Sequence, residues 1–231
     1  MSRQVKLMHL GRISYEEAWQ LQEDLFVQKT TLKLQQKPPV LADGCSHHLL
    51  MCEHPPVYTL GKNGKEEHLL AKPEELLSKG VQYFKNNRGG DITFHGPGQI
   101  VAYPIFDLED WKRDIHWYMR SLEEVVIRTL KDYGIIGERI EKVTGVWIAP
   151  KSPQARKICA FGVRTSRWVS MHGLALNVNT DLNYFKWIVP CGIADKGVAS
   201  MQEELGMELD MMKVETSLKY YFEQVFEMKL C

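Results

Sequence analysis

Residues 88–106 read RGGDITFHGPGQIVAYPIF, two apolar runs that are joined by Gly-Pro-Gly. Glycine and proline at these places are typical of tight turns, and the runs DITF and IVAYPIF are typical of strands, so the stretch predicts part of a sheet. Pro104 has no backbone N–H, so we expect its strand to lie at a sheet edge or to be irregular. In the first strand, alternation places Thr93 and His95 on one face and Phe94 on the other.

Further strand and helix patterns lie on both sides of this stretch. Strands are expected at 48–52, 57–61, 81–84, 145–149, 157–164 and 168–178. Helices are expected after the capping box Ser14–Glu17, from Pro73 to Gly80, over 112–133, and beyond a second capping box at Ser200–Glu203. Runs of strands between isolated helices predict an α+β fold, with a mixed or antiparallel sheet flanked by helices, as one domain over residues 1–231.

The bulk composition limits the partners. With 29 basic and 29 acidic residues, no net field draws the chain to nucleic acid or to an anionic membrane, and no apolar run is long enough to span a bilayer. We therefore expect neither nucleic acid nor a membrane as a partner. The first 15 residues carry Arg3, Lys6 and Arg12 but no acid, which faintly suggests a mitochondrial presequence.

Two patterns that suggest ligands fail on spacing. The glycines of RGGDITFHGPGQ match neither the dinucleotide fingerprint nor a P-loop, so a tight turn plus a hairpin is the favoured interpretation on spacing alone. The second pattern is a group of cysteines and histidines, namely Cys45, His47, His48, Cys52 and His54. Its spacing matches no common zinc site, so we expect a buried Cys52, surface histidines and no metal.

Cys191 and Lys157 are the candidates for chemistry. Cys191 lies in WIVPCG, where Pro190 fixes the approach of the chain and Gly192 leaves space after the thiol, although a buried small hydrophobic role stays open. A cysteine with an ordinary pKa is only slightly ionised at neutral pH, so a nucleophilic role requires a nearby cation. Lys157 opens KICAFGVR, and strand alternation places it on the face of Cys159 and Phe161; an exposed lysine at a strand end is the alternative.

Several separated motifs together resemble the octanoyl transferase (LipB-type) family, including its mitochondrial members. They are EHPPVYTLG (53–61), RGGDITFHGPGQ (88–99), KICAFG (157–162), HGLALN (172–177) and PCG (190–192). The resemblance implies the fold of the biotin and lipoate protein ligase catalytic domain. It also implies transfer of octanoyl from octanoyl-acyl carrier protein to lysines of lipoyl domains, in 2-oxoacid dehydrogenase complexes and the glycine cleavage H protein, as the first step of endogenous lipoylation and without a cofactor.

The resemblance also implies roles for individual residues. Cys191 would carry the acyl group as a thioester, and Lys157 would lower the pKa of its thiol. The substrate-contacting positions would be Arg88, Gly89, Gly90, Asp91, Ile92, Thr93, Phe94, His95, Ala160, Phe161, Gly162, Gly173, Leu174 and Ala175. Before Pro190 the chain reads Lys-Trp-Ile-Val and departs from the bacterial T-H-x-N. This form resembles eukaryotic members, which implies a mitochondrial location.

Two alternatives stay open. An ATP-dependent lipoate or biotin protein ligase would share the fold, but the chain lacks a G-R-G-R-x-G-R stretch and carries Cys191 with Lys157. A module that only binds acyl carrier protein or lipoyl domains would need neither residue.

Overall fold

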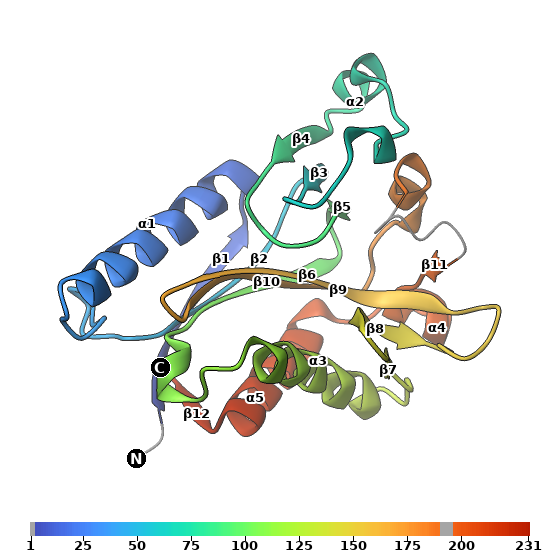
Figure 1. Cartoon of the computed structure of the whole chain (residues 1–231). Coiled ribbons are helices and arrows are strands. Elements are labelled where there is room, and N and C mark those ends of the chain that lie inside the picture. Colours follow the sequence, from blue (N-terminus) through green and yellow to red (C-terminus); the bar gives the residue numbers. More distant parts are fainter. Residues whose placement is uncertain (1–2, 190–195) are drawn as a thin grey trace.

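The computed structural model describes residues 3–189 and 196–231, which form a large sheet, a small sheet and flanking helices (Figure 1). The large sheet has the strand order β12 (Met228–Leu230), β1 (Arg3–Arg12), β2 (His48–Glu53), β6 (Gln99–Ile105), β10 (Val169–Asn177), β9 (Arg156–Ser166), β8 (Val143–Ile148) and β7 (Glu138–Ile140), and β11 (Gly197–Val198) pairs with β9. β1 runs parallel to β2 and β12, whereas the strands from β2 to β7 pair antiparallel. The predicted α+β fold with a mixed sheet is confirmed.

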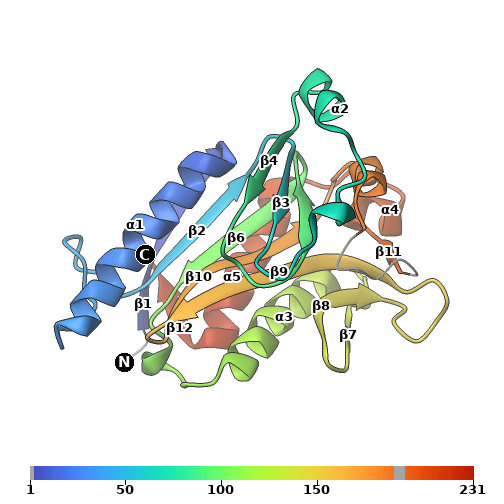
Figure 2. The same ribbon diagram turned by 45° about the horizontal axis from the view of Figure 1, so that its top comes forward.

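The small sheet and the helices form the layers on the two faces. The small sheet has the order β4 (Gln82–Lys85), β3 (Val57–Leu60) and β5 (Ile92–His95). It lies on the same side of the large sheet as α1 (Tyr15–Leu34), and α3 (Ile115–Asp132) and α5 (Met211–Phe226) cover the other side (Figures 1 and 2). Short helices are α2 (Pro73–Ser78), α4 (Met201–Leu205), η1 (Glu66–His68), η2 (Leu108–Asp110) and η3 (Leu182–Trp187).

Caps fix where the helices begin. Ser14 is the N-cap of α1: its hydroxyl accepts the backbone N–H of Glu17 at 3.2 Å and donates to the Glu17 carboxylate at 2.6 Å, so one of the two bonds of the predicted capping box is present. The long central helix begins at Ile115, three residues later than expected, because the Asp114 carboxylate accepts the Trp117 N–H at 2.9 Å.

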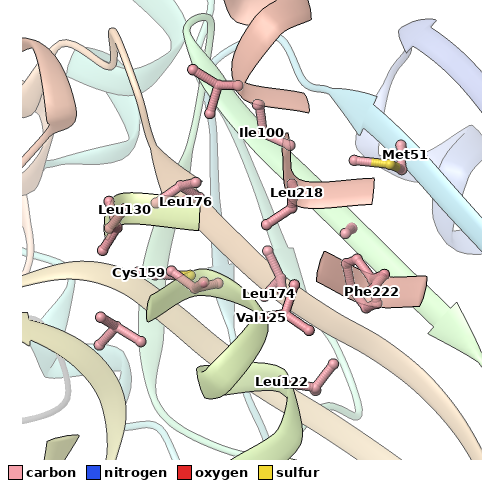
Figure 3. Packing of buried hydrophobic residues seen from close by; sticks show 14 of the residues in the cluster. Met51, Ile100, Leu122, Val125, Leu130, Cys159, Leu174, Leu176, Leu218 and Phe222 are labelled. Atoms are coloured by element: carbon pink, nitrogen blue, oxygen red, sulfur yellow. The ribbon is translucent and has the colours of Figure 1, made fainter. Parts of the chain in front are cut away.

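The main core lies between the large sheet and the pair α3 and α5. Leu122 and Val125 of α3 and Phe222 of α5 pack against Leu174 of β10 and its neighbours, as Figure 3 shows. Each large apolar side chain buried there contributes about 1.5–3 kcal/mol. A second cluster packs α1 against the opposite face of the same sheet.

The acid-free start of the chain forms part of the sheet. Residues Arg3–Arg12 are strand β1, and Val5 is fully buried in the main core. From the sequence this segment gives only a faint targeting signal and no predicted strand, because its alternation is broken at His9 and Gly11, which are exposed.

Pro104 lies in an interior strand whose pairing with β10 is interrupted, so of the two expectations the sheet edge is wrong and the irregular strand is confirmed. β6 pairs with β2 on one side and with β10 on the other, but the register with β10 ends at the pair Ala102 and Leu174. A Cβ at Gly173 would lie 2.7 Å from Pro104 Cδ and 2.1 Å from the Ala102 oxygen. The proline ring therefore lies where the ladder between β6 and β10 is interrupted. Pairing resumes beyond it, where the Ser170 N–H donates to the Phe106 carbonyl at 2.9 Å.

The expected surface histidines are buried. His47, His48 and His54 are at most 3% exposed, and Cys52 is buried as predicted. His54 donates through Nδ1 to the Ile13 carbonyl at 2.9 Å and accepts from the Tyr103 hydroxyl at 2.8 Å, so a polar partner on each side compensates its burial. Among the residues described, no three His, Cys, Asp or Glu side chains gather as a metal site would require. No helix in this part of the chain is long and apolar enough to cross a membrane.

Candidate active site

A cavity of about 470 Å³ lies between the glycine-rich loop (residues 86–91, between β4 and β5), the strands β9 and β10, and the start of α1. Lys157 lines it, as do thirteen of the fourteen predicted substrate-contacting residues. These thirteen are Arg88, Gly89, Gly90, Asp91, Ile92, Thr93, His95, Ala160, Phe161, Gly162, Gly173, Leu174 and Ala175. Segments that are far apart in the sequence therefore meet at one cavity.

Phe94 is the exception. Its side chain is 1% exposed and stacks on Tyr184 at 4.5 Å, within a separate cluster under the small sheet. Thr93 and His95 line the cavity, so the predicted alternation along this strand is correct, but it directs Phe94 away from the cavity.

Three consecutive side chains fasten the loop that leads into the cavity. Asn86 donates to the Tyr15 hydroxyl at 2.5 Å, and Asn87 donates to the Glu23 carboxylate at 2.7 Å, both on α1. Arg88 donates to the Thr59 carbonyl at 2.6 Å on β3. The loop is thus fixed to a helix and to the small sheet before its glycines begin.

Glycines bring backbone against backbone at this loop. The Gly89 N–H donates to the Val163 carbonyl of β9 at 2.9 Å. A Cβ at Gly162 would lie 2.8 Å from the Gly89 oxygen, and one at Gly61 would lie 2.4 Å from the Gly90 oxygen. The glycines are therefore required for the loop to cross β9 closely.

A bulge determines which way Lys157 points. In the ladder between β8 and β9, Trp147 is opposite Lys157, but Val146 is opposite Cys159, so Ile158 is the extra residue. Ile158 and Cys159 both pack into the main core, whereas Lys157 and Ala160 both line the cavity. The expectation that Lys157 shares a face with Cys159 is wrong, because alternation does not continue through a bulge.

The sheet surface beneath the cavity is made of small residues. Ala160 is paired with Ala175, and Gly162 with Gly173, across β9 and β10. Leu174 lines the cavity but is only 2% exposed and belongs to the main core, and Phe161 packs against that core. The space above β9 and β10 is therefore left by glycine and alanine.

The inner end of the cavity is polar. His95 donates to the Gln99 side chain at 2.8 Å and stacks on Tyr15, and His172 donates to the Asn87 side chain at 2.8 Å. Burial lowers the pKa of His95 and of His172 to about 3, so both rings are neutral near pH 7. Tyr15, Tyr103 and His172 also line the cavity and are not among the predicted site residues. For His172 a signal was available, since it opens the HGLALN motif.

Cys191 lies outside the described residues. On the near side of that segment, the Val189 N–H donates to the His68 carbonyl at 2.8 Å. On the far side, β11 runs parallel to β9 with Val198 in register with Lys157. The chain on the far side of the segment therefore runs beside Lys157.

Comparisons with known proteins show which protein family the chain resembles. The model of the lipoyl protein ligase A/B catalytic domain family matches residues 14–223. An octanoyltransferase of Flavobacterium johnsoniae is 50% identical over the whole of both chains. An octanoyltransferase of Christiangramia forsetii is 48% identical, with 100% of this chain and 99% of the relative covered.

Solved structures share the fold at low sequence identity. A bipartite lipoate protein ligase of Thermoplasma acidophilum, described with its E2 lipoyl domain, superposes with a TM-score of 0.70 at 16% identity, over 100% of this chain and 86% of that chain. The biotin protein ligase of Aquifex aeolicus superposes with a TM-score of 0.52 at 12% identity, over 98% and 71%. The expected likeness to the biotin and lipoate ligase fold is confirmed.

The mitochondrial prediction is wrong. The relatives at about half identity come from bacteria such as Flavobacterium, Christiangramia and Bacteroides. The sequence Lys-Trp-Ile-Val before Pro190 was therefore no sign of a eukaryotic protein, and residues 3–12, the other signal, form strand β1.

Proposed function

Since the chain belongs to the lipoyl protein ligase A/B catalytic domain family and is an octanoyltransferase, we propose that it carries the octanoyl group as a thioester on Cys191. A free cysteine has a pKa of about 8.5 and is mostly protonated at neutral pH. We assign the cation that favours the thiolate to Lys157.

The position of Lys157 is the observation that carries this proposal. Its side chain enters the cavity between the glycine-rich loop and the small-residue surface of β9 and β10. Beyond the segment that carries Cys191, β11 pairs with β9 and places Val198 in register with Lys157. We propose that Cys191 lies within reach of this lysine. An opposite charge within about 4–6 Å favours the ionised thiol.

In the first half-reaction the Cys191 thiolate attacks the carbonyl carbon of octanoyl-acyl carrier protein. The new carbon–sulfur bond forms, and the bond to the pantetheine sulfur breaks. The leaving thiolate takes a proton from the Lys157 ammonium, which releases the carrier thiol and leaves Lys157 as a neutral amine. One thioester replaces another of similar energy, so the chemistry requires no ATP.

In the second half-reaction the lysine amine of a lipoyl domain attacks the enzyme thioester. The carbon–nitrogen bond forms, the carbon–sulfur bond of Cys191 breaks, and the amine loses a proton. The first half-reaction has left Lys157 as a neutral amine, because its proton went to the carrier thiol. Lys157 then accepts the proton of the attacking amine as general base.

We place the acyl chain along the cavity that Arg88 to Thr93, His95, Ala160 to Gly162 and Gly173 to Ala175 line. Each methylene buried there contributes about 0.8 kcal/mol. The small side chains of Ala160 and Ala175, together with Gly162 and Gly173, leave the room for the chain, whereas Phe94 faces another cluster and has an indirect role.

The proposed donor is octanoyl-acyl carrier protein. The proposed acceptors are the lipoyl domains of 2-oxoacid dehydrogenase complexes and the glycine cleavage H protein, which would make this reaction the first step of endogenous lipoylation. The structural relative described with its E2 lipoyl domain supports an acceptor of this type.

Single-turnover mass spectrometry separates this proposal from an ATP-dependent ligase. The protein is mixed either with octanoyl-acyl carrier protein alone or with free octanoate and ATP. We expect a covalent octanoyl adduct with the carrier alone, and no gain from ATP. A product that forms only from free octanoate and ATP would contradict the proposal.

A further inference from the structure

We propose that Trp147 is a positioning residue that holds the Lys157 ammonium at the cavity through a cation–π contact. Lys157 Nζ lies 4.8 Å from the centroid of the Trp147 ring. Ammonium groups within about 6 Å of an indole centroid are attracted to the negative face of the ring. This inference rests on the proposed function, because the ammonium that it positions is the one assigned to the Cys191 thiolate.

The ladder between β8 and β9 sets the pair in place. Trp147 and Lys157 are directly opposite each other in this antiparallel pair, so both side chains project from the same face. The bulge at Ile158 begins immediately after Lys157, so the pair is the last regular one before the ladder shifts. Without that shift, Ala160 would not share the face of Lys157.

Gly145 provides the space that the pair occupies. A Cβ at this position would lie 2.9 Å from Trp147 Nε1 and 3.1 Å from Lys157 Cε. The Gly145 N–H donates at 3.0 Å to the fully buried Glu123 carboxylate, which Arg120 at 2.6 Å and Arg139 at 3.1 Å also hold. The backbone beneath the ring and the lysine stem is thus anchored from α3.

The Trp147 ring is built into the protein and does not lie loosely on its surface. It is 2% exposed, and its Nε1–H is buried with no hydrogen-bond partner among residues 3–189 and 196–231. A buried N–H without a hydrogen-bond partner destabilises the folded state, so other interactions of Trp147 must compensate for it. A buried ring also attracts a cation more strongly than an exposed one, since water competes less.

Other charged groups lie near the pair of Trp147 and Lys157 or line the cavity, and they contribute to any pH dependence measured there. Lys196, which precedes β11, lies 6.0 Å from the same ring centroid. Asp91 of the glycine-rich loop, Arg88 and Lys142 line the cavity with Lys157, and Glu123 lies beneath Gly145. His95 and His172 at the inner end are neutral above about pH 4, because burial lowers their pKa to about 3.

The pH dependence of Cys191 alkylation tests the proposal. Full-length wild type, Trp147→Leu, Trp147→Phe and Lys157→Met are treated briefly with iodoacetamide from pH 5 to 10, and modification of the Cys191 peptide is followed by mass spectrometry. Trp147→Leu removes the aromatic face and should raise the midpoint by about half to one pH unit. Trp147→Phe keeps a face and should stay closer to wild type, and Lys157→Met should shift furthest.

The outcomes distinguish this inference from the function on which it rests. A shift in Lys157→Met with none in Trp147→Leu would overturn the role of Trp147 and leave the role of Lys157 intact. No shift in either variant would overturn both. Equal shifts in the Leu and Phe variants would overturn the cation–π account, because the aromatic face would then contribute nothing.

Trp111 provides a matched control. Its ring has Arg3 over it at 5.0 Å, and it is partly buried and packs against the main core beside Phe226. Trp111→Leu should lower thermal stability but leave the Cys191 midpoint unchanged, and a midpoint shift there would overturn the specific role of Trp147. If Trp147→Leu does not fold, Trp147→Met, which fills irregular space, takes its place with the same expected shift.

Discussion

At the scale of single residues, the shape of the cavity depends on glycines, which carry no side chain. The Gly162 Cα faces the Gly89 carbonyl, and an added Cβ would lie 2.8 Å from that backbone oxygen. The contact is with backbone, which cannot rotate away as a flexible side chain can. The loop and β9 are therefore matched to each other within a few tenths of an ångström.

This contact makes Gly162→Ala a sensitive variant. We expect the loop to be pushed off β9, with a loss of about 1–3 kcal/mol in the free energy of unfolding and a large loss of acyl transfer. Urea titration and single-turnover adduct formation measure the two effects. Gly197→Ala is the control for stability, because its Cβ would come no closer than 3.4 Å to another atom. Equal stability of Gly162→Ala and wild type would contradict the close approach.

At the scale of elements, local patterns predicted most helices and strands. The N-cap at Ser14 and the apolar spacing of the central helix depend on neighbouring residues only, and both were predicted correctly. Pro104 and the bulge at Ile158 depend on where a partner strand ends or slips, which the sequence of one strand does not contain. β1 was missed because its pairing with two distant strands, and not its own alternation, makes it a strand.

The same reasoning applies to the candidate site. The glycine-rich loop, KICAFG and HGLALN were identified as motifs, and the structure brings them to one cavity. Phe94 and Leu174 were assigned with their motif neighbours, but strand alternation turns Phe94 away and packs Leu174 into the main core. The burial of His54 and the place of His172 in the site were missed, because their partners Tyr103 and Asn87 come from β6 and from a distant loop.

The attachment of the loop to α1 gives a prediction for Asn87. Asn87→Ala removes the bonds to Glu23 and to His172, so the loop loses one of its three anchors. We expect a higher KM for the acyl donor, a lower rate of adduct formation at subsaturating donor, and a loss of about 1–3 kcal/mol because His172 is left buried without its partner. Gln20→Ala on the exposed face of α1 removes only a bond to Asp24 and should change none of these. An unchanged KM in Asn87→Ala would show that the loop does not need this anchor.

At the scale of the whole molecule, buried neutral histidines couple stability to pH. Burial lowers the pKa of His54 to about 4 and that of His47, His95 and His172 to about 3, against 6.5 for an ordinary histidine. Below pH 6.5 these histidines bind protons in the unfolded chain but stay neutral in the folded chain. The free energy of unfolding therefore falls as the pH drops toward 4. The prediction of one domain over residues 1–231 stays a prediction, which a single cooperative transition would support.

The pH effect is large enough to measure. Each of these four histidines should lower the free energy of unfolding by about 2 kcal/mol between neutral pH and pH 5. Urea midpoints at pH 7.5 and pH 5 measure the sum. His54→Gln should make the dependence shallower, because it removes one of the four histidines whose pKa burial lowers. A wild-type midpoint that is equal at the two pH values would contradict burial of neutral rings.

The most direct test of the central claim locates the octanoyl group on the chain. Wild type, Cys191→Ala and Cys231→Ala are incubated with octanoyl-acyl carrier protein without ATP, and the intact proteins and their peptides are weighed. We predict one octanoyl group on the Cys191 peptide of wild type and of Cys231→Ala, whose exposed thiol is the matched control, and none on Cys191→Ala. An adduct of equal yield on folded Cys191→Ala would contradict the account.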